Sequence, residues 1–162
     1  MTEAPVPPHG TESGSAGGHQ TYILFGVAGT TYAVRSHQVL HVEMVEQVTA
    51  VPNAPGCVEG VVFSRGQVVP VINLRSRFGF ERAQLDIRTR LLVVQVDGRR
   101  VGLMADDARE FIGIADAAIR PPNEAIGGLS GSYLEGVATL GDRIVLVLDV
   151  RAIVEIVPTA VA

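Results

Sequence analysis

The chain repeats its own sequence, and this duplication limits the folds that it can adopt. The hydrophobic run at 22–34 matches a second run at 91–103, and the segment that begins at Cys57 matches the segment that begins at Tyr133. The second match continues without a gap, and its identical pairs include Glu59/Glu135, Gly60/Gly136, Val61/Val137 and Arg75/Arg151. Such a repeat predicts two lobes of similar shape, each about 70 residues long and too small to be stable alone.

Each half of the duplication contains two predicted β-hairpins followed by a short helix. The paired runs are 22–27 with 32–34, 58–63 with 67–72, 90–96 with 99–105, and 133–140 with 143–148. Asp97-Gly98 between the third pair is a strong hairpin-turn signal. Asn73 and Asp149 stand where helix N-caps are expected, ahead of 74–78 and 150–157. Because closure removes exposed sheet edges, the pattern favours an all-β fold of two small, packed barrels with short helices.

Changes in composition mark the expected boundaries of the folded region. Residues 1–20 are rich in Pro, Gly, Ser and Thr, so we expect a disordered N-terminal tail there. Residues 21–157 should form the two lobes, with a connection between them near 80–88 and a short C-terminal tail at 158–162.

Composition excludes several classes of function. The sequence contains no lysine, which rules out phosphate-loop, kinase and Schiff-base lysines. A net charge of −4 with 5% aromatic residues is unlike a nucleic-acid-binding protein. The longest apolar runs fall far short of the roughly 20 residues of a membrane-spanning helix, so we expect no membrane insertion and a cytoplasmic protein. Cys57 is the single cysteine and is expected to be a small core residue.

No arrangement of residues predicts catalysis or a bound cofactor. None of the four histidines (His9, His19, His37 and His41) has a partner at metal-ligand spacing. Asn73 and Asp149 occupy matched positions, as the catalytic pair of an aspartic protease would, but one of them is an amide and cannot share a proton. A small β-barrel hydrolase is therefore the less favoured alternative to a binding protein.

The hairpin turn at Arg65-Gly66 is the main candidate binding feature. A guanidinium held at the tip of two apolar strands presents a rigid fork to a partner carboxylate. The same residue is also consistent with an ordinary solvated turn, and spacing alone does not separate these readings.

The sequence resembles the CheW-like family, the coupling proteins of bacterial chemotaxis. The segment 58–79, which contains Arg65-Gly66 and Pro70-Val71-Ile72-Asn73-Leu74, resembles the family pattern Gly-Val-x-Asn-Leu-Arg-Gly-x-Val-x-Pro-Val-x-Asp-Leu. Similar matches are Val51-Pro-Asn-Ala-Pro, Val101-Gly-Leu-Met-Ala-Asp, Tyr133-Leu-Glu-Gly-Val-Ala and Val145-Leu-Val-Leu-Asp-Val. The resemblance covers about 21–157 in the family's order and spacing.

The resemblance implies two packed five-stranded SH3-like barrels without catalysis or cofactor. It implies a scaffold that couples the cytoplasmic tip of methyl-accepting chemoreceptors to the regulatory domain of a CheA-type histidine kinase, in a cytoplasmic or membrane-associated array. By the same resemblance, Arg65, Gly60 and Gly66 are the receptor-coupling residues, and Val39 and His41 are candidate partner contacts.

The chain departs from the family pattern near this hairpin. Phe63-Ser64 replaces Asn-Leu before Arg-Gly, Asn73 replaces an Asp, and His41 stands at a position that is commonly acidic. These changes leave open a CheW-like paralogue of a non-standard chemosensory pathway, which modulates or competes for array assembly. The sequence does not identify the receptors, the stimulus or the output.

Overall fold

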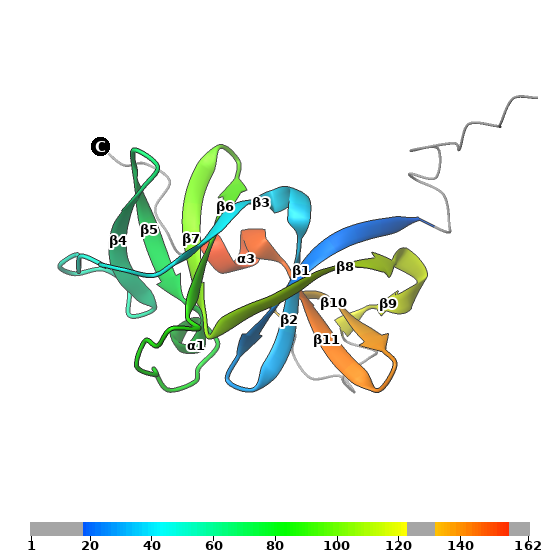
Figure 1. Ribbon diagram of the computed structural model, residues 1–162. Coiled ribbons are helices and arrows are strands. Elements are labelled where there is room, and N and C mark those ends of the chain that lie inside the picture. The colour runs from blue at the N-terminus through cyan, green and yellow to red at the C-terminus, as the bar shows by residue number, and fades with distance from the viewer. Residues whose placement is uncertain (1–17, 123–131, 156–162) are drawn as a thin grey trace, which may run out of the picture.

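The computed structural model describes residues 18–122 and 132–155, which form two β-sheets with a few short helices (Figure 1). The strands are β1 (His19–Val27), β2 (Thr30–Arg35), β3 (Val39–Met44), β4 (Val58–Ser64), β5 (Gln67–Asn73), β6 (Arg90–Val96), β7 (Arg99–Ala105), β8 (Asp107–Ala115), β9 (Ile119–Arg120), β10 (Leu134–Leu140) and β11 (Arg143–Leu148). The helices are η1 (Ser36–Gln38), α1 (Leu74–Arg77), η2 (Asp116–Ala118) and α3 (Val150–Val154). The predicted all-β class and the four predicted hairpins are confirmed.

The two sheets exchange their first hairpins, which corrects the expectation of one lobe for each repeat. The six-stranded sheet has the order β8-β1-β2-β11-β10-β9, so the first hairpin of the first repeat lies in the sheet of the second. The five-stranded sheet has the order β3-β6-β7-β5-β4. In each sheet, one parallel pair joins the strands of the first repeat to those of the second: β2 pairs with β11, and β5 pairs with β7. The segment 80–88 lies between β5 and β6, which both belong to the five-stranded sheet. It therefore does not connect two lobes, as was expected.

Each sheet closes on itself because one continuous stretch of chain serves both of its edges. The edge strand β8 leads through η2 into β9, which pairs with β10 at the other edge. In the five-stranded sheet, the chain after edge strand β3 reaches the other edge at Thr49, which pairs with Val61 of β4 through two backbone hydrogen bonds of 2.8 Å. The two-residue strand β9 accounts for the sixth strand of a barrel that was expected to have five.

Glycine is required where the chain crosses β4 and β10 to close the barrels. Gly60 has φ +147°, and a Cβ there would lie 2.1 Å from the carbonyl oxygen of Thr49. A Cβ on Gly136 would lie 2.4 Å from Cγ2 of Ile119. Both glycines follow a β-bulge in their strand. The two repeats therefore close their barrels with the same local structure, a bulge followed by a glycine.

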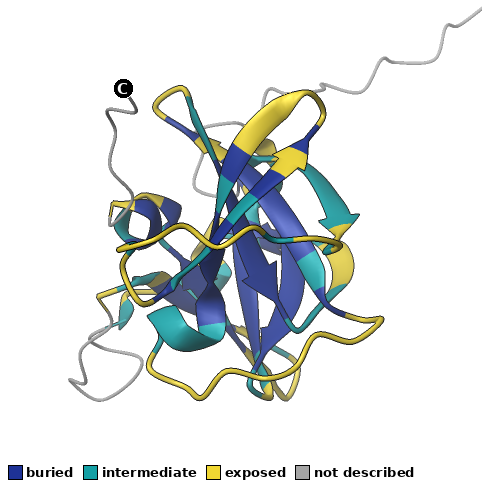
Figure 2. Ribbon diagram, turned by 90° about the vertical axis from the view of Figure 1, so that its left-hand side faces the viewer, coloured by how far each residue is buried: buried dark blue, intermediate teal, exposed yellow. Residues whose placement is uncertain are grey.

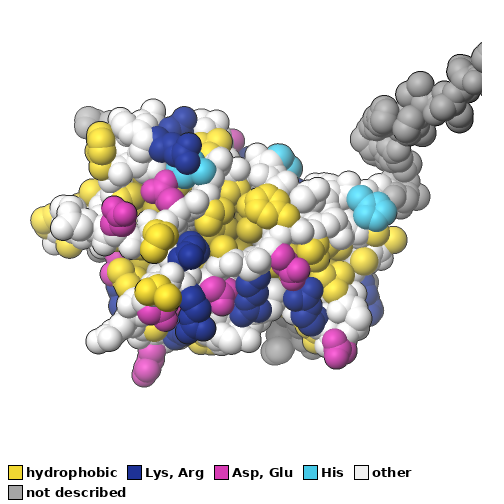
Figure 3. Space-filling view, in the orientation of Figure 1, with side chains coloured by type: hydrophobic (Ala, Val, Ile, Leu, Met, Phe, Trp, Pro, Cys, Tyr) yellow, Lys and Arg dark blue, Asp and Glu magenta, His cyan; other side chains and the backbone are white. Residues whose placement is uncertain are grey.

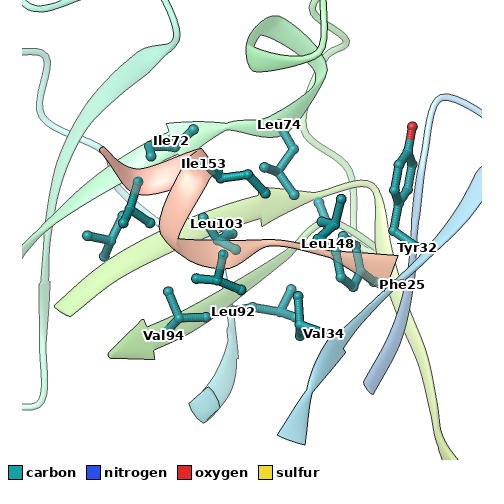
Figure 4. Close-up of a cluster of buried hydrophobic side chains, with 14 of the residues drawn as sticks. Phe25, Tyr32, Val34, Ile72, Leu74, Leu92, Val94, Leu103, Leu148 and Ile153 are labelled. Atoms are coloured by element: carbon teal, nitrogen blue, oxygen red, sulfur yellow. The ribbon is translucent and has the colours of Figure 1, made fainter. Parts of the chain in front are cut away.

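The largest hydrophobic cluster lies between the sheets, and smaller clusters fill the barrels. Alternate residues of β1 divide between these clusters: Tyr22 and Leu24 point into the six-stranded barrel, while Ile23 and Phe25 join the central cluster. Figure 4 shows Ile153 of α3 beside Ile72, Leu74 and Leu103, with side chains of β1, β2 and β6 in the same cluster. The barrels consequently share one core, and the exposed segments form its outer covering (Figure 2).

Polar contacts fix the exchanged hairpins against the rest of the chain. Arg75 of α1 donates to both carboxylate oxygens of Asp106, and the backbone N–H of Ala28 in the β1–β2 turn donates to the same carboxylate at 2.8 Å. The matching residue of the second repeat, Arg151, pairs with Asp97 in the β6–β7 turn. Each helix thereby holds the turn of a hairpin at the junction of the sheets.

The remaining sequence expectations have mixed outcomes. Asn73 Oδ1 accepts a hydrogen bond from Ser76 N and Asp149 Oδ1 accepts one from Ala152 N, which confirms both caps. Cys57 is buried, as predicted. The strand β1 already begins at His19, inside the expected tail; residues 1–17 and the tail expected at 158–162 lie outside the described residues. No helix in the described ranges is long and apolar enough to span a membrane.

Candidate docking surface

The tip of the β4–β5 hairpin carries a strained arginine. Arg65 has φ +49° and Gly66 has φ +82°, so both central residues of the turn adopt the left-handed conformation. That conformation suits Gly, Asn and Asp and is unfavourable for Arg. Among the described residues, the Arg65 guanidinium makes no hydrogen bond and no ion pair. The guanidinium of Arg65 is therefore exposed without a partner among the described residues, in a backbone conformation that favours glycine or asparagine over arginine.

Two large hydrophobic side chains lie next to this tip. Phe63 of β4 and Val68 of β5 are directly paired across the hairpin and are 75% and 66% exposed. The alternation of β4 places the flanking Val62 and Ser64 inward, and Phe63 and Arg65 therefore face solvent. Exposed side chains of this size next to a charged turn are typical of a protein interaction surface.

A groove of about 710 Å³ runs beside the hairpin. It lies between the edge strands β3 and β4 of the five-stranded barrel, where these strands do not pair with each other. Its lining residues are Glu43, Met44, Val45, Glu46, Gln47, Thr49, Val61, Val62, Phe63, Val68 and Leu91. In Figure 3, hydrophobic and acidic side chains lie next to each other at the end of the molecule that carries β4 and β5. Apolar side chains bordered by the carboxylates of Glu43 and Glu46 can hold an amphipathic segment of another protein.

His41, Glu43 and Ser64 form a polar cluster at one end of the groove. Ser64 Oγ donates to Glu43 Oε2 at 2.8 Å, and His41 Nε2 lies 2.7 Å from that oxygen and 3.1 Å from Ser64 Oγ. A serine hydrolase needs the serine to donate to the histidine and the acid to lie on the opposite ring nitrogen. Here the serine proton goes to the carboxylate and Ser64 is only 4% exposed, so the cluster has neither the order nor the access of a catalytic triad.

Of the sequence-predicted site residues, Val39, His41 and Gly60 are buried or half-buried, and the two residues of the turn are exposed. Val39 is half-buried against the central cluster and does not line the groove. His41 is half-buried on β3, and its ring is directed at Glu43 and Ser64. Gly60 is buried near Thr49, at the far end of β4 from the tip. Arg65 and Gly66 are exposed together at the turn.

The sequence reasoning missed the main features of the groove. Phe63 was noted only as a departure from a family pattern, although its alternation with Val62 and Ser64 places it outward once the strand face is known. Glu43 gave no signal because a single acidic residue in a strand is common on solvent-facing positions. No cluster of His, Cys, Asp or Glu within the described ranges has the geometry of a metal site.

Comparison with known proteins identifies the family. The model of the CheW-like domain matches residues 21–157. The chain belongs to the CheW-like family. The chemotaxis protein CheW of Klebsiella aerogenes is 29% identical over 132 residues, covering 82% of this chain and 80% of that protein. The chemotaxis protein CheW of Helicobacter pylori is 31% identical over 134 residues, covering 83% and 81%.

A solved structure of the CheW-like family has the same architecture. The scaffolding protein TtCheW from Thermoanaerobacter tengcongensis superposes with a TM-score of 0.77 at 26% identity, covering 84% of this chain and 92% of that one. The agreement includes most of the described barrels, so the double-barrel CheW-like fold inferred from the sequence is confirmed.

Proposed function

We propose that this CheW-like chain is a non-enzymatic chemotaxis adaptor that couples methyl-accepting chemoreceptors to a CheA-type histidine kinase. The observation that carries the proposal is the hairpin tip, where Arg65, without an ion pair among the described residues, stands in a strained turn beside the exposed Phe63 and Val68. Strain of this kind persists where the surrounding structure fixes it and is often related to function. The names of the relatives, CheW and a scaffolding CheW, support an adaptor rather than an enzyme.

The architecture suits a rigid connector between two partners. The barrels share one continuous core, so their outer faces keep a fixed relative orientation. The hairpin β4–β5 and its repeat-related counterpart β10–β11 belong to different sheets, and each exposes an aliphatic residue at the same repeat position, Val68 and Ile144. Such a molecule transmits signals through differential contacts with the states of its partners rather than through chemistry.

Reversing the charge at position 65 tests the proposal. We expect Arg65→Glu to weaken binding of a soluble chemoreceptor-tip fragment at least about tenfold, because an acidic partner group would meet a like charge. Binding of the kinase regulatory domain should persist. The matched control is Arg143→Glu in the counterpart hairpin, whose ion pair with Glu110 is exposed. Surface plasmon resonance measures both affinities, and unchanged receptor affinity in Arg65→Glu would refute the assigned role.

A second candidate is a paralogue that binds the same partners but only competes for them. It is favoured by one observation: two departures from the family pattern, His41 and Ser64, contact each other beside the hairpin tip. Reconstituted kinase activity distinguishes the two. An adaptor raises or couples the activity in the presence of receptor, whereas a competitor lowers the activity that an established adaptor produces.

A further inference from the structure

The five-stranded barrel is closed incompletely along one seam. Its edge strands, β3 and β4, do not pair directly, and the only described backbone bridge across the seam joins Thr49 and Val61. The groove occupies the seam beyond that bridge, toward the hairpin tip. Without another contact, the tip of β4–β5 would be held on this side by backbone pairing at Val61 alone.

The cluster of His41, Glu43 and Ser64 supplies this contact. Two members stand on β3 and one on β4, immediately before Arg65. The single Ser64 proton is donated to Glu43, so the His41 nitrogen that lies 2.7 Å from the carboxylate must carry a proton of its own. Ser64 Oγ is then both a donor to Glu43 and an acceptor from His41, and every link from β3 to β4 in this cluster passes through Ser64.

We propose that His41, Glu43 and Ser64 are positioning residues that latch β3 to β4 across the seam and thereby fix the groove and the hairpin tip for partner binding. The latch acts on the surface described under the proposed function, and its effect on affinity rests on that function. The alternation of β4 directs Ser64 inward, where the latch fixes it, and its neighbours Phe63 and Arg65 face solvent. A surface fixed before binding loses less conformational entropy when a partner docks.

The counterpart seam offers a matched control. In the six-stranded barrel, Arg143 near the β10–β11 tip pairs with Glu110 of the edge strand β8 at 3.1 Å. Both side chains are more than 40% exposed, so this ion pair is more strongly screened by solvent than the latch. Replacing Glu110 by Gln changes a charge across the second seam without touching the first.

The latch is tested first without a partner, by amide hydrogen exchange of the full chain. Ser64→Ala removes the β4 member and leaves the pair on β3, so the protection factors of residues 63–68 should fall about fivefold, with those of β6 and β7 unchanged. Glu43→Gln keeps an acceptor for Ser64 and removes the charge, so the same protection factors should fall by a smaller amount, because hydrogen bonds to a neutral acceptor are weaker. Glu110→Gln should behave as wild type.

Receptor binding then tests the consequence for docking. Ser64→Ala should bind the chemoreceptor-tip fragment about threefold more weakly than the wild-type chain, and Glu110→Gln should bind it as the wild type does. Protection factors and affinities that are the same in wild type, Ser64→Ala and Glu43→Gln would overturn the latch. Protection factors that fall in Ser64→Ala, in a chain that binds no receptor fragment in either form, would overturn the proposed function and leave the latch standing.

Discussion

The family resemblance implies that Gly60 acts in receptor coupling, but the backbone geometry already explains why a glycine stands at this position. Its φ of +147° and the 2.1 Å approach of the Thr49 carbonyl oxygen to the Cβ position leave no room for a side chain. Because Thr49 is the point where the five-stranded barrel closes, any larger residue at position 60 pushes the closing segment away from β4. Gly60 therefore supports the groove and the tip from a distance and need not touch a partner.

Substitution of two glycines in the same hairpin separates barrel closure from turn conformation. We expect Gly60→Ala to lower the free energy of unfolding by about 2–4 kcal/mol, since it combines strain with overlap of backbone atoms. Gly66→Ala meets nothing within 4 Å and should cost only about 1 kcal/mol, from its left-handed conformation. Urea denaturation measures both values. Equal losses in the two variants would show that the approach to Thr49 carries no cost.

At the scale of elements, the junction between the sheets depends on Asp106. Burial alone would raise the pKa of this carboxyl, but the Arg75 guanidinium and the Ala28 N–H stabilise the charged form and hold its pKa below the usual value. A carboxyl whose pKa is lower in the folded state stabilises the fold above its unfolded pKa of about 3.9. That contribution is lost as the pH falls through the lower, folded value.

Asp106→Asn tests this junction through the pH dependence of stability. At neutral pH we expect the variant to lose about 1–2 kcal/mol of unfolding free energy, because charge-assisted hydrogen bonds are replaced by weaker ones. The difference from wild type should shrink as the pH falls below about 4. The control Asp97→Asn removes the repeat-related but largely exposed pair with Arg151 and should cost much less. A difference that stays constant down to pH 2.5 would contradict the role of the Asp106 charge.

The elements that the sequence predicted are those with a clear alternation or cap. The β6–β7 hairpin was predicted with its observed bounds because Asp97-Gly98 separates two apolar runs. The strand β8 was not among the predicted elements. Only one residue of β8, Ile114, is buried, so this strand has no hydrophobic periodicity from which to recognise it.

At the scale of the whole molecule, the duplication predicted two similar barrels but not the exchange of hairpins between them. The exchange does not alter the local sequence pattern, because the β1–β2 and β6–β7 hairpins have the same apolar pattern. Either hairpin therefore fits beside β4–β5 or β10–β11. The difference lies in long-range pairing, in the parallel contacts of β2 with β11 and β5 with β7. The groove and the latch also depend on this assembly, since they join residues from the two edges of one sheet.

The exchange also supports the proposed coupling role. Each sheet contains strands of both repeats, and the central cluster packs the two sheets together. The two barrels therefore form one rigid body. Two docking faces on such a body hold their partners at a fixed spacing and angle. A flexible pair of domains would instead bind both partners without setting their geometry.

Simultaneous binding of both partners is the most direct test of the adaptor. The full chain is mixed with a soluble chemoreceptor-tip fragment and a CheA-type kinase regulatory domain, and the mass of the complexes is measured by analytical ultracentrifugation. The account predicts one complex that contains all three proteins, which Arg65→Glu reduces to the chain and the kinase domain. Mutual displacement of the two partners, or binding of neither, would contradict it.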